Sequence, residues 1–168
     1  MKNRAVTGIV VATLLAFVNL SQAGTSGSEA TQTTYHTATV GEVKVFYRQA
    51  GAENLPILLL LHGFPSSSHQ FRELIPLLAA EYHVIAPDLP GFGNTVAPPR
   101  GEYEYTFDNL AKTIQGLTDT LGLDKYAMYL FDYGAPIGFR LATANPEKIT
   151  AIISQNGNTY EEGLSHLR

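Results

Sequence analysis

One acidic residue, Asp132, lies where the sequence predicts a sharp turn between a strand and a helix. It directly follows the apolar segment 125–131 and stands two residues before Gly134. Small residues beside such a turn let the backbone close tightly, and the turn lifts the central side chain clear of the sheet. The N–H groups that open the next helix would stabilise a negative charge there. Asp132 is therefore a candidate nucleophile, although an aspartate in this place is also a common helix N-cap.

Two other segments with polar or turn-forming residues follow apolar runs in the same way. His62-Gly63-Phe64-Pro65 comes after the run 57–61, and Asp88-Leu89-Pro90-Gly91 begins where the run 83–88 ends. Ligand chemistry in open α/β sheets collects at the carboxyl ends of the strands. We therefore expect these two segments to lie beside Asp132 at one edge of a sheet.

The elements that must position these residues follow from hydrophobic periodicity. Two short runs of β-branched and aromatic residues around Gly41 predict an antiparallel hairpin at a sheet edge, and continuous apolar runs predict strands buried on both faces. Helical spacing predicts three helices, the first kinked at Pro76. The predicted strands are 35–40, 42–48, 57–61, 83–88, 125–131 and 149–154, and the predicted helices are 68–80, 106–121 and 134–145. This order predicts an α/β fold with a mostly parallel, doubly wound sheet and an N-terminal hairpin.

Composition limits the classes of protein to which the chain can belong. Its 168 residues are 45% hydrophobic with a net charge of −4, which favours one globular domain and disfavours disorder. The acidic balance disfavours nucleic acid as a partner, because phosphate binding needs a basic face. The chain contains no cysteine, which excludes disulfides and cysteine-ligated metal. We predict no cofactor and no metal; the oligomeric state is left open.

The first residues have the order of a secretory signal peptide. Lys2 and Arg4 form a basic start, 5–18 is an uncharged apolar run, and Ser21-Gln22-Ala23 offers small residues to a signal peptidase. A transmembrane anchor is the alternative, but the run is shorter than the roughly 20 residues a span needs. We predict a signal peptide over 1–23, a flexible linker over 24–34 and a globular portion over 35–168. The protein would then be periplasmic or secreted, with no stable membrane anchor after cleavage.

Three segments together resemble the landmark motifs of the α/β-hydrolase superfamily. They are Leu61-His62-Gly63-Phe64-Pro65, Asp88-Leu89-Pro90-Gly91-Phe92-Gly93 and Phe131-Asp132-Tyr133-Gly134-Ala135-Pro136-Ile137-Gly138. More narrowly, they are similar to the epoxide hydrolase and haloalkane dehalogenase branch, whose nucleophile elbow commonly reads His-Asp-Trp-Gly. The resemblance covers about 35–160 and implies the N-terminal portion of an α/β-hydrolase domain.

The resemblance implies a catalytic role for Asp132 and supporting roles for three other residues. Asp132 would attack a saturated carbon of a small apolar substrate and form an alkyl ester, and a histidine would activate water to hydrolyse that ester. The backbone N–H groups of Phe64 and Tyr133 would form the oxyanion hole. His62 would be positional, and Asp88 would support the turn that follows it.

The histidine base and its acid are not evident in this sequence. None of the five histidines, at positions 36, 62, 69, 83 and 166, is well placed as the base, and Glu161 and Glu162 are weak candidates for the acid. The superfamily sheet has more strands than this sequence predicts. By resemblance, the base, the acid and a helical cap domain are expected beyond Arg168, so the chain alone is expected not to turn over substrate.

Two departures from the branch bear on the reaction. Tyr133 replaces the usual Trp, and Phe64 stands where dehalogenases often have Asn, so both usual halide donors are absent or altered. This favours an epoxide hydrolase-like reaction, with haloalkane dehalogenation as the alternative. The elbow has no serine, which disfavours an esterase. A truncated, non-catalytic or binding protein on the hydrolase scaffold is the remaining alternative.

Overall fold

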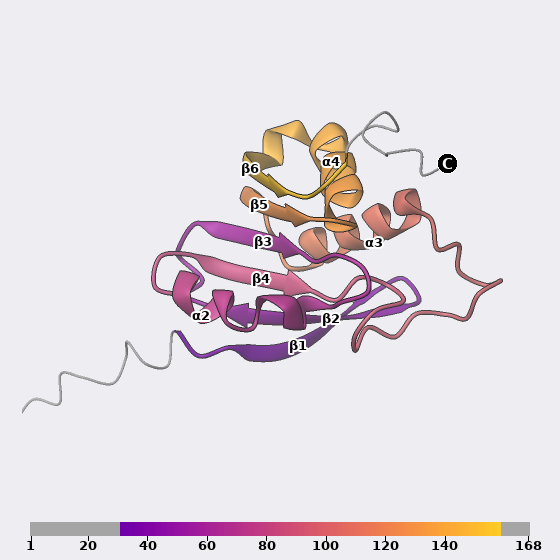
Figure 1. Ribbon diagram of the computed structural model, residues 1–168, viewed down its shortest axis with the longest axis horizontal. Coiled ribbons are helices and arrows are strands. Elements are labelled where there is room, and N and C mark those ends of the chain that lie inside the picture. Colours follow the sequence, from indigo (N-terminus) through magenta and orange to yellow (C-terminus); the bar gives the residue numbers. More distant parts are fainter. Residues whose placement is uncertain (1–30, 159–168) are drawn as a thin grey trace, which may run out of the picture.

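A computed structural model describes residues 31–158 and shows one six-stranded sheet with helices on both faces (Figure 1). The strands are β1 (Thr34–Val40), β2 (Val43–Ala50), β3 (Ile57–Leu61), β4 (His83–Pro87), β5 (Tyr126–Phe131) and β6 (Ile149–Gln155). The helices are α2 (Leu74–Leu78), α3 (Phe107–Thr120) and α4 (Gly134–Ala144), with short 3-10 turns η1 (Ser68–Phe71) and η2 (Pro146–Lys148). The predicted signal peptide and most of the predicted linker lie outside the described residues, and Thr34, predicted as linker, begins β1.

The strand order is β1-β2-β4-β3-β5-β6. The hairpin β1–β2 is antiparallel and joins β4 through a second antiparallel pairing, whereas β4, β3, β5 and β6 run parallel. The continuous apolar run of β3 places this strand between two others and under helices on both faces, as fully apolar strands require. The predicted mostly parallel α/β sheet with an N-terminal hairpin is confirmed.

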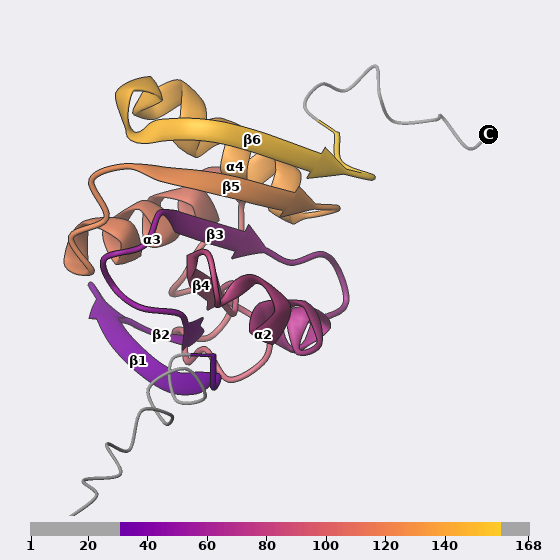
Figure 2. The same cartoon turned by 90° about the vertical axis from the view of Figure 1, so that its left-hand side faces the viewer.

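Two cores lie on opposite faces of the sheet. Leu59 and Leu61 of β3 pack with side chains of α3 and α4, whereas Leu58 and Leu60 pack with Ile75 of α2. Figure 2 shows α3 and α4 on one side of the sheet and α2 on the other. Alternate residues of one strand therefore hold both helical layers, and this fixes the strand ends where the motif residues lie.

The predicted helix 68–80 is wrong as one element. The segment forms η1 and α2 separately, and Pro76 lies in the first turn of α2. A proline is tolerated there because the first helical N–H groups have no intrahelical acceptor. The segment therefore breaks before the proline instead of kinking at it.

Arg48 is a charged residue of β2 that lies buried in the structure. Its side chain is buried, donates through Nε to Ser68 Oγ at 3.0 Å, and lies over the ring of Tyr35 with 5.0 Å to the centroid. The flat, weakly hydrated guanidinium suits such stacking. Arg48 therefore ties the hairpin to η1. Within residues 31–158, no helix is both long and apolar enough to cross a membrane.

Candidate active site

Asp132 occupies a tight turn between β5 and α4 and has a positive φ of 50°. The N–H of Ala135 donates to the carbonyl of Asp132 at 3.0 Å and closes the turn. Gly134 lies so close to β3 that a Cβ there would come within 2.3 Å of the Leu61 carbonyl oxygen. A Cβ on Gly63 would come within 2.5 Å of Asp132 Cβ. Both glycines are therefore needed for the strand ends to meet around this aspartate.

The carboxylate of Asp132 accepts two backbone hydrogen bonds on one oxygen. Oδ1 lies 2.9 Å from the Phe64 nitrogen and 2.7 Å from the Tyr133 nitrogen. These are the two N–H groups that the resemblance assigns to an oxyanion hole. Oδ2 has no hydrogen bond from any described residue. Among the described residues, one carboxylate oxygen thus has two backbone donors and the other has none.

His62 is fully buried at the end of β3 and uses both ring nitrogens. Nε2 accepts from the Leu89 N–H at 3.0 Å, so the ring proton is on Nδ1, which donates to the Gly63 carbonyl at 3.0 Å. Burial lowers the pKa of His62 below its usual value, against smaller opposing effects of the Gly63 hydrogen bond and the Asp88 charge. The ring is therefore a neutral link between two loops and has no free nitrogen to serve as a base.

Asp88 holds the loop after β4 in a comparable way. The carboxylate is fully buried, and its two oxygens accept from the Ser68 and Asn94 N–H groups, each at 2.7 Å. Its carbonyl accepts from Thr95 Oγ1 at 2.6 Å. Charge-assisted hydrogen bonds of this kind are among the stronger ones in proteins. Asp88 thus joins η1 to the turn that follows β4 and is not directed at Asp132.

The remaining sequence candidates are not gathered around Asp132. His36 lies on β1, His69 on η1 and His83 at the start of β4. In the part of the chain that the structure describes, no histidine hydrogen-bonds to Asp132. His166, Glu161 and Glu162 lie outside the described residues. Residues 31–158 also contain no group of three or more His, Cys, Asp or Glu side chains arranged to hold a metal ion.

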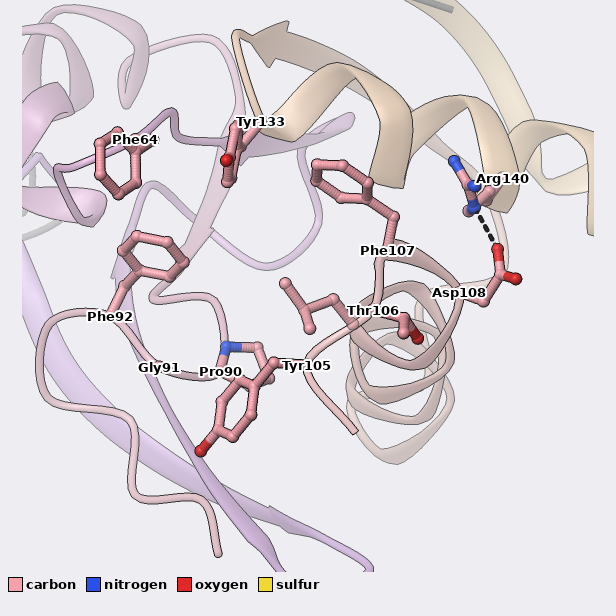
Figure 3. Close-up of a pocket in the computed structure, with 11 residues that line it drawn as sticks. Phe64, Pro90, Gly91, Phe92, Tyr105, Thr106, Phe107, Asp108, Tyr133 and Arg140 are labelled. Atoms are coloured by element: carbon pink, nitrogen blue, oxygen red, sulfur yellow. Dashed lines mark hydrogen bonds and ion pairs between the residues drawn. The ribbon is translucent and has the colours of Figure 1, made fainter. Parts of the chain in front are cut away.

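A cavity of about 600 Å³ opens beside the two N–H donors (Figure 3). Its walls are largely aromatic, and the Tyr133 ring is centred 5.4 Å from Phe64, 6.4 Å from Phe92 and 5.0 Å from Phe107. The lining residues are Phe64, Pro90, Gly91, Phe92, Tyr105, Thr106, Phe107, Asp108, Leu110, Tyr133 and Arg140. Such a concave, apolar site with a few polar groups suits a small apolar ligand.

Part of this cavity was not evident from sequence. Phe92 belongs to a recognised motif, but Phe107 reads as a core residue of α3, and Tyr105 lies in a loop without regular periodicity. The far rim is formed by Asp108 and Arg140, which make an ion pair. The hydrogen bond and the charge of Arg140 lower the pKa of Asp108. Tertiary packing alone brings these segments together.

Comparison with known proteins identifies similar sequences. A family model described as alpha/beta hydrolase fold matches residues 56–167. An uncharacterized hydrolase of Saccharomyces cerevisiae is 61% identical over 122 residues, which are 73% of this chain and 41% of that protein. A haloalkane dehalogenase of Psychrobacter cryohalolentis is 37% identical, with 68% and 38% covered. Epoxide hydrolase 4 of Mus musculus is 35% identical, with 68% and 32% covered.

A solved structure shows the same arrangement of elements. The haloalkane dehalogenase DbeA of Bradyrhizobium elkani superposes with a TM-score of 0.71 at 31% identity, over 75% of this chain and 42% of that chain. The chain spans less than half the length of each of these similar proteins.

Proposed function

The chain belongs to the α/β-hydrolase fold family, and from this premise we propose that Asp132 is a nucleophile that opens a small apolar epoxide and forms an alkyl ester. The observation that carries the proposal is the pair of backbone N–H groups, from Phe64 and Tyr133, on one oxygen of the Asp132 carboxylate. An ordinary N-cap aspartate would bond to N–H groups of its own helix and would not need a donor 68 residues away.

The geometry gives the two carboxylate oxygens different tasks. Oδ2 attacks the saturated carbon, and no base is needed because a carboxylate already carries the electron pair. Oδ1 then becomes the carbonyl oxygen of the ester. When water later attacks the ester carbon, negative charge develops on Oδ1, where the two N–H groups already lie within 2.9 Å. Donors fixed in advance around a developing charge are a large source of rate acceleration.

Hydrolysis of the ester requires a base that activates water. His62 is not available for this because both of its ring nitrogens are hydrogen-bonded to backbone groups. The described residues therefore support the alkylation step, and alkylation is the step that can be tested on this chain directly.

The side chains next to Asp132 favour an epoxide over a haloalkane. Release of a halide is assisted by side-chain N–H donors, and neither Phe64 nor Tyr133 carries one. Haloalkane dehalogenation is the second candidate, because proteins of that name are among the similar sequences and structures. A binding protein on this scaffold would hold the ligand in the aromatic cavity without forming a bond.

Covalent labelling tests the proposal. The purified chain is incubated with styrene oxide or 1-iodobutane, and its intact mass is followed over time before the modified peptide is sequenced. An epoxide adds its whole mass, whereas an alkyl iodide adds only its alkyl group and releases iodide. We expect labelling at Asp132, faster with the epoxide.

The matched control separates chemistry from nonspecific modification. Asp132→Asn keeps the shape of the side chain and should label at least about a thousandfold more slowly. Asp124→Asn, at an exposed carboxylate away from the cavity, should label as the unchanged chain does. Equal labelling of all three proteins, or labelling elsewhere, would refute the assignment. Reversible binding without a mass change would favour the binding protein.

A further inference from the structure

We propose that a cavity at the amino ends of β3 and β4, called here the amino-end cavity, is a second ligand site that binds a small primary ammonium ion. Its volume is about 320 Å³, near the lower limit for sites that bind small molecules. The lining residues are Tyr47, Gln49, Glu53, Ile57, His83, Ile85, Leu121, Gly122 and Leu123. None of them lines the aromatic cavity, so the second site stands without the proposed function.

Strand pairing builds the amino-end cavity at the edge of the sheet opposite to Asp132. Strands β3 and β4 begin there, with Ile57 and His83 in register, and the antiparallel strand β2 ends there. The His83 N–H donates to the Pro56 carbonyl at 3.0 Å, which fixes the backbone at this position. Strands β3, β4 and β5 point the same way in Figure 1, so their amino ends lie away from the turn that holds Asp132.

The side chain of His83 is the first observation that points to a ligand. It is 7% exposed, and its Nε2 is buried and has no hydrogen-bond partner among the described residues. Burial lowers the pKa of the ring, so at neutral pH the ring is uncharged and one of its nitrogens accepts a hydrogen bond. A buried polar group without a partner costs free energy, and a ligand that bonds to it removes this cost.

Tyr47 adds a second polar group to the lining. Its side chain is also 7% exposed, and its ring stacks on His36 with 5.3 Å between the ring centres. Burial raises the pKa of the Tyr47 hydroxyl, and no hydrogen bond acts on that pKa. The hydroxyl therefore stays protonated, and its oxygen is available as an acceptor.

The charges around the amino-end cavity favour a cation. The carboxylate of Glu53 is exposed, and its charge acts on the His83 ring by raising the pKa against the larger effect of burial. Helix α3 ends directly before the lining residues Leu121 and Gly122, and the carboxyl end of a helix carries a partial negative charge. No lysine or arginine is among the described residues of the lining. A cation is therefore attracted to this cavity, and an anion is repelled.

A primary ammonium group matches these acceptors. It has N–H donors and no acceptor, and the lining offers an imidazole nitrogen, a carboxylate and a phenol oxygen. Ile57, Ile85 and Leu123 supply apolar contacts for a short alkyl chain. A metal ion fits less well, because His83 and Glu53 are the only His, Cys, Asp or Glu residues of the described lining, and a structural metal site needs more ligands.

Nuclear magnetic resonance of the isotope-labelled chain tests the site. n-Butylammonium chloride is titrated at pH 8, where the amine is protonated and His83 is neutral, and the backbone amide signals are followed. Butyrate and 1-butanol are matched probes of the same chain length with a negative charge or none, and Zn²⁺ is titrated separately. The variants are Glu53→Gln and His83→Leu. Glu81→Gln, at an exposed carboxylate outside the lining, is the control.

We expect n-butylammonium to shift the signals of Glu53, His83 and Gly122, with a dissociation constant on the order of 1 mM for so small a ligand. Glu53→Gln should weaken binding about tenfold and His83→Leu about fivefold, because each removes an acceptor. Glu81→Gln should change the affinity by less than about twofold. Since Glu53 is exposed, its variant keeps the test valid even where His83→Leu fails to fold.

Four results would overturn the assignment. The first is the absence of signal changes with n-butylammonium, or changes confined to the aromatic cavity. The second is equally strong binding of butyrate or 1-butanol, which would show a cavity without preference for a cation. The third is binding of Zn²⁺ without binding of the amine, and the fourth is an unchanged affinity of Glu53→Gln.

Discussion

Two buried histidines lie at opposite ends of the parallel strands, and the hydrogen bonds of their ring nitrogens differ. His62, at the carboxyl end of β3, has hydrogen bonds at both ring nitrogens. His83, at the amino end of β4, is 7% exposed, and its Nε2 has no partner among the described residues. It lines a cavity of about 320 Å³ with Glu53, Tyr47 and other residues. A histidine thus links two loops at the carboxyl end, whereas at the amino end a histidine ring nitrogen has no described hydrogen-bond partner.

The two ends of the parallel strands also differ in the contacts of their other buried residues. At the carboxyl end, Asp88 and Asp132 each accept two backbone hydrogen bonds, and in each case one donor is distant in sequence, Ser68 for Asp88 and Phe64 for Asp132. At the amino end, the buried neighbours of His83 include the apolar core residues Ile85 and Leu123, and His83 Nε2 has no partner among the described residues. Hydrogen bonds fix direction and distance, whereas apolar packing mostly fixes volume. Atomic positions are therefore fixed most closely by hydrogen bonds at the end where the proposed nucleophile lies.

Removing Asp88 should have the largest effect. Asp88→Ala leaves the Ser68 and Asn94 N–H groups without their charged acceptor in a buried site, so we expect a loss of about 3 kcal/mol or more in the free energy of unfolding. Urea denaturation followed by circular dichroism measures it. Asp124→Ala, at an exposed position, should change stability by less than about 0.5 kcal/mol. Comparable losses for the two would remove the distinction between the ends.

Adding one methyl group at each end gives a second comparison. Gly63→Ala places a Cβ within 2.5 Å of Asp132 Cβ, so Asp132 must shift, and labelling by styrene oxide should slow about a hundredfold. Gly122 follows α3 at the amino end, and a Cβ there meets nothing within 4 Å. Gly122→Ala should cost about 1 kcal/mol in stability, because its φ is +65°, and leave the labelling rate intact. Unimpaired labelling of Gly63→Ala would show that the site tolerates displacement.

Replacing the two histidines in turn tests whether His62 contributes more to stability than His83 does. His62→Leu leaves the Leu89 N–H and the Gly63 carbonyl unpaired, and we expect a loss of about 2 kcal/mol. His83→Leu removes a nitrogen that has no described partner, so stability should change by less than about 1 kcal/mol or should rise. Equilibrium unfolding at pH 8, where both rings are neutral, gives the two values. A larger loss at His83 than at His62 would contradict the comparison.

The pH dependence of stability should show both histidines with the same sign. Burial lowers the pKa of His62 and of His83 below the usual 6.5, so near and below that pH the unfolded chain binds protons that the folded chain does not. Stability is then full above about pH 6.5 and falls as the pH decreases, by up to about 1.4 kcal/mol per pH unit for each histidine. Unfolding at pH 7.5, 6.5 and 5.5 measures the slope, which should be shallower in either leucine variant. An unchanged slope in both would assign the acid sensitivity to other groups.

Much of the sheet could be predicted because its signals are local. The apolar run 57–61 and the turn residues at 62–65 are contiguous in sequence, and β3 has the predicted bounds. The helix at 68–80 could not be placed correctly, because apolar spacing alone does not show that the chain breaks between η1 and α2. Burial of Arg48 was equally hidden, since its partners Ser68 and Tyr35 lie on other elements.

In the candidate site, too, the residues in local motifs could be predicted and those brought in by tertiary packing could not. Asp132, Phe64 and Tyr133 stand in recognisable motifs, and the structure brings their atoms together. Phe107 and Tyr105 complete the cavity from a helix start and a loop, and nothing in their local sequence distinguishes them from core or surface aromatics.

The positive φ of Asp132 has a consequence for selection. A residue with a Cβ pays about 1 kcal/mol to adopt this backbone conformation, whereas glycine adopts it without strain. Asp132→Gly removes this strain, and the Phe64 and Tyr133 N–H groups that lose their acceptor belong to exposed residues, where water can replace it, so the variant should unfold at a higher temperature than the unchanged chain while losing its capacity to be alkylated. A library of variants screened for heat resistance alone would enrich glycine at this position. The most heat-resistant variants would then lack the carboxylate that is alkylated. Stability and activity thus rank the same substitution in opposite orders, and a screen of this protein must measure both.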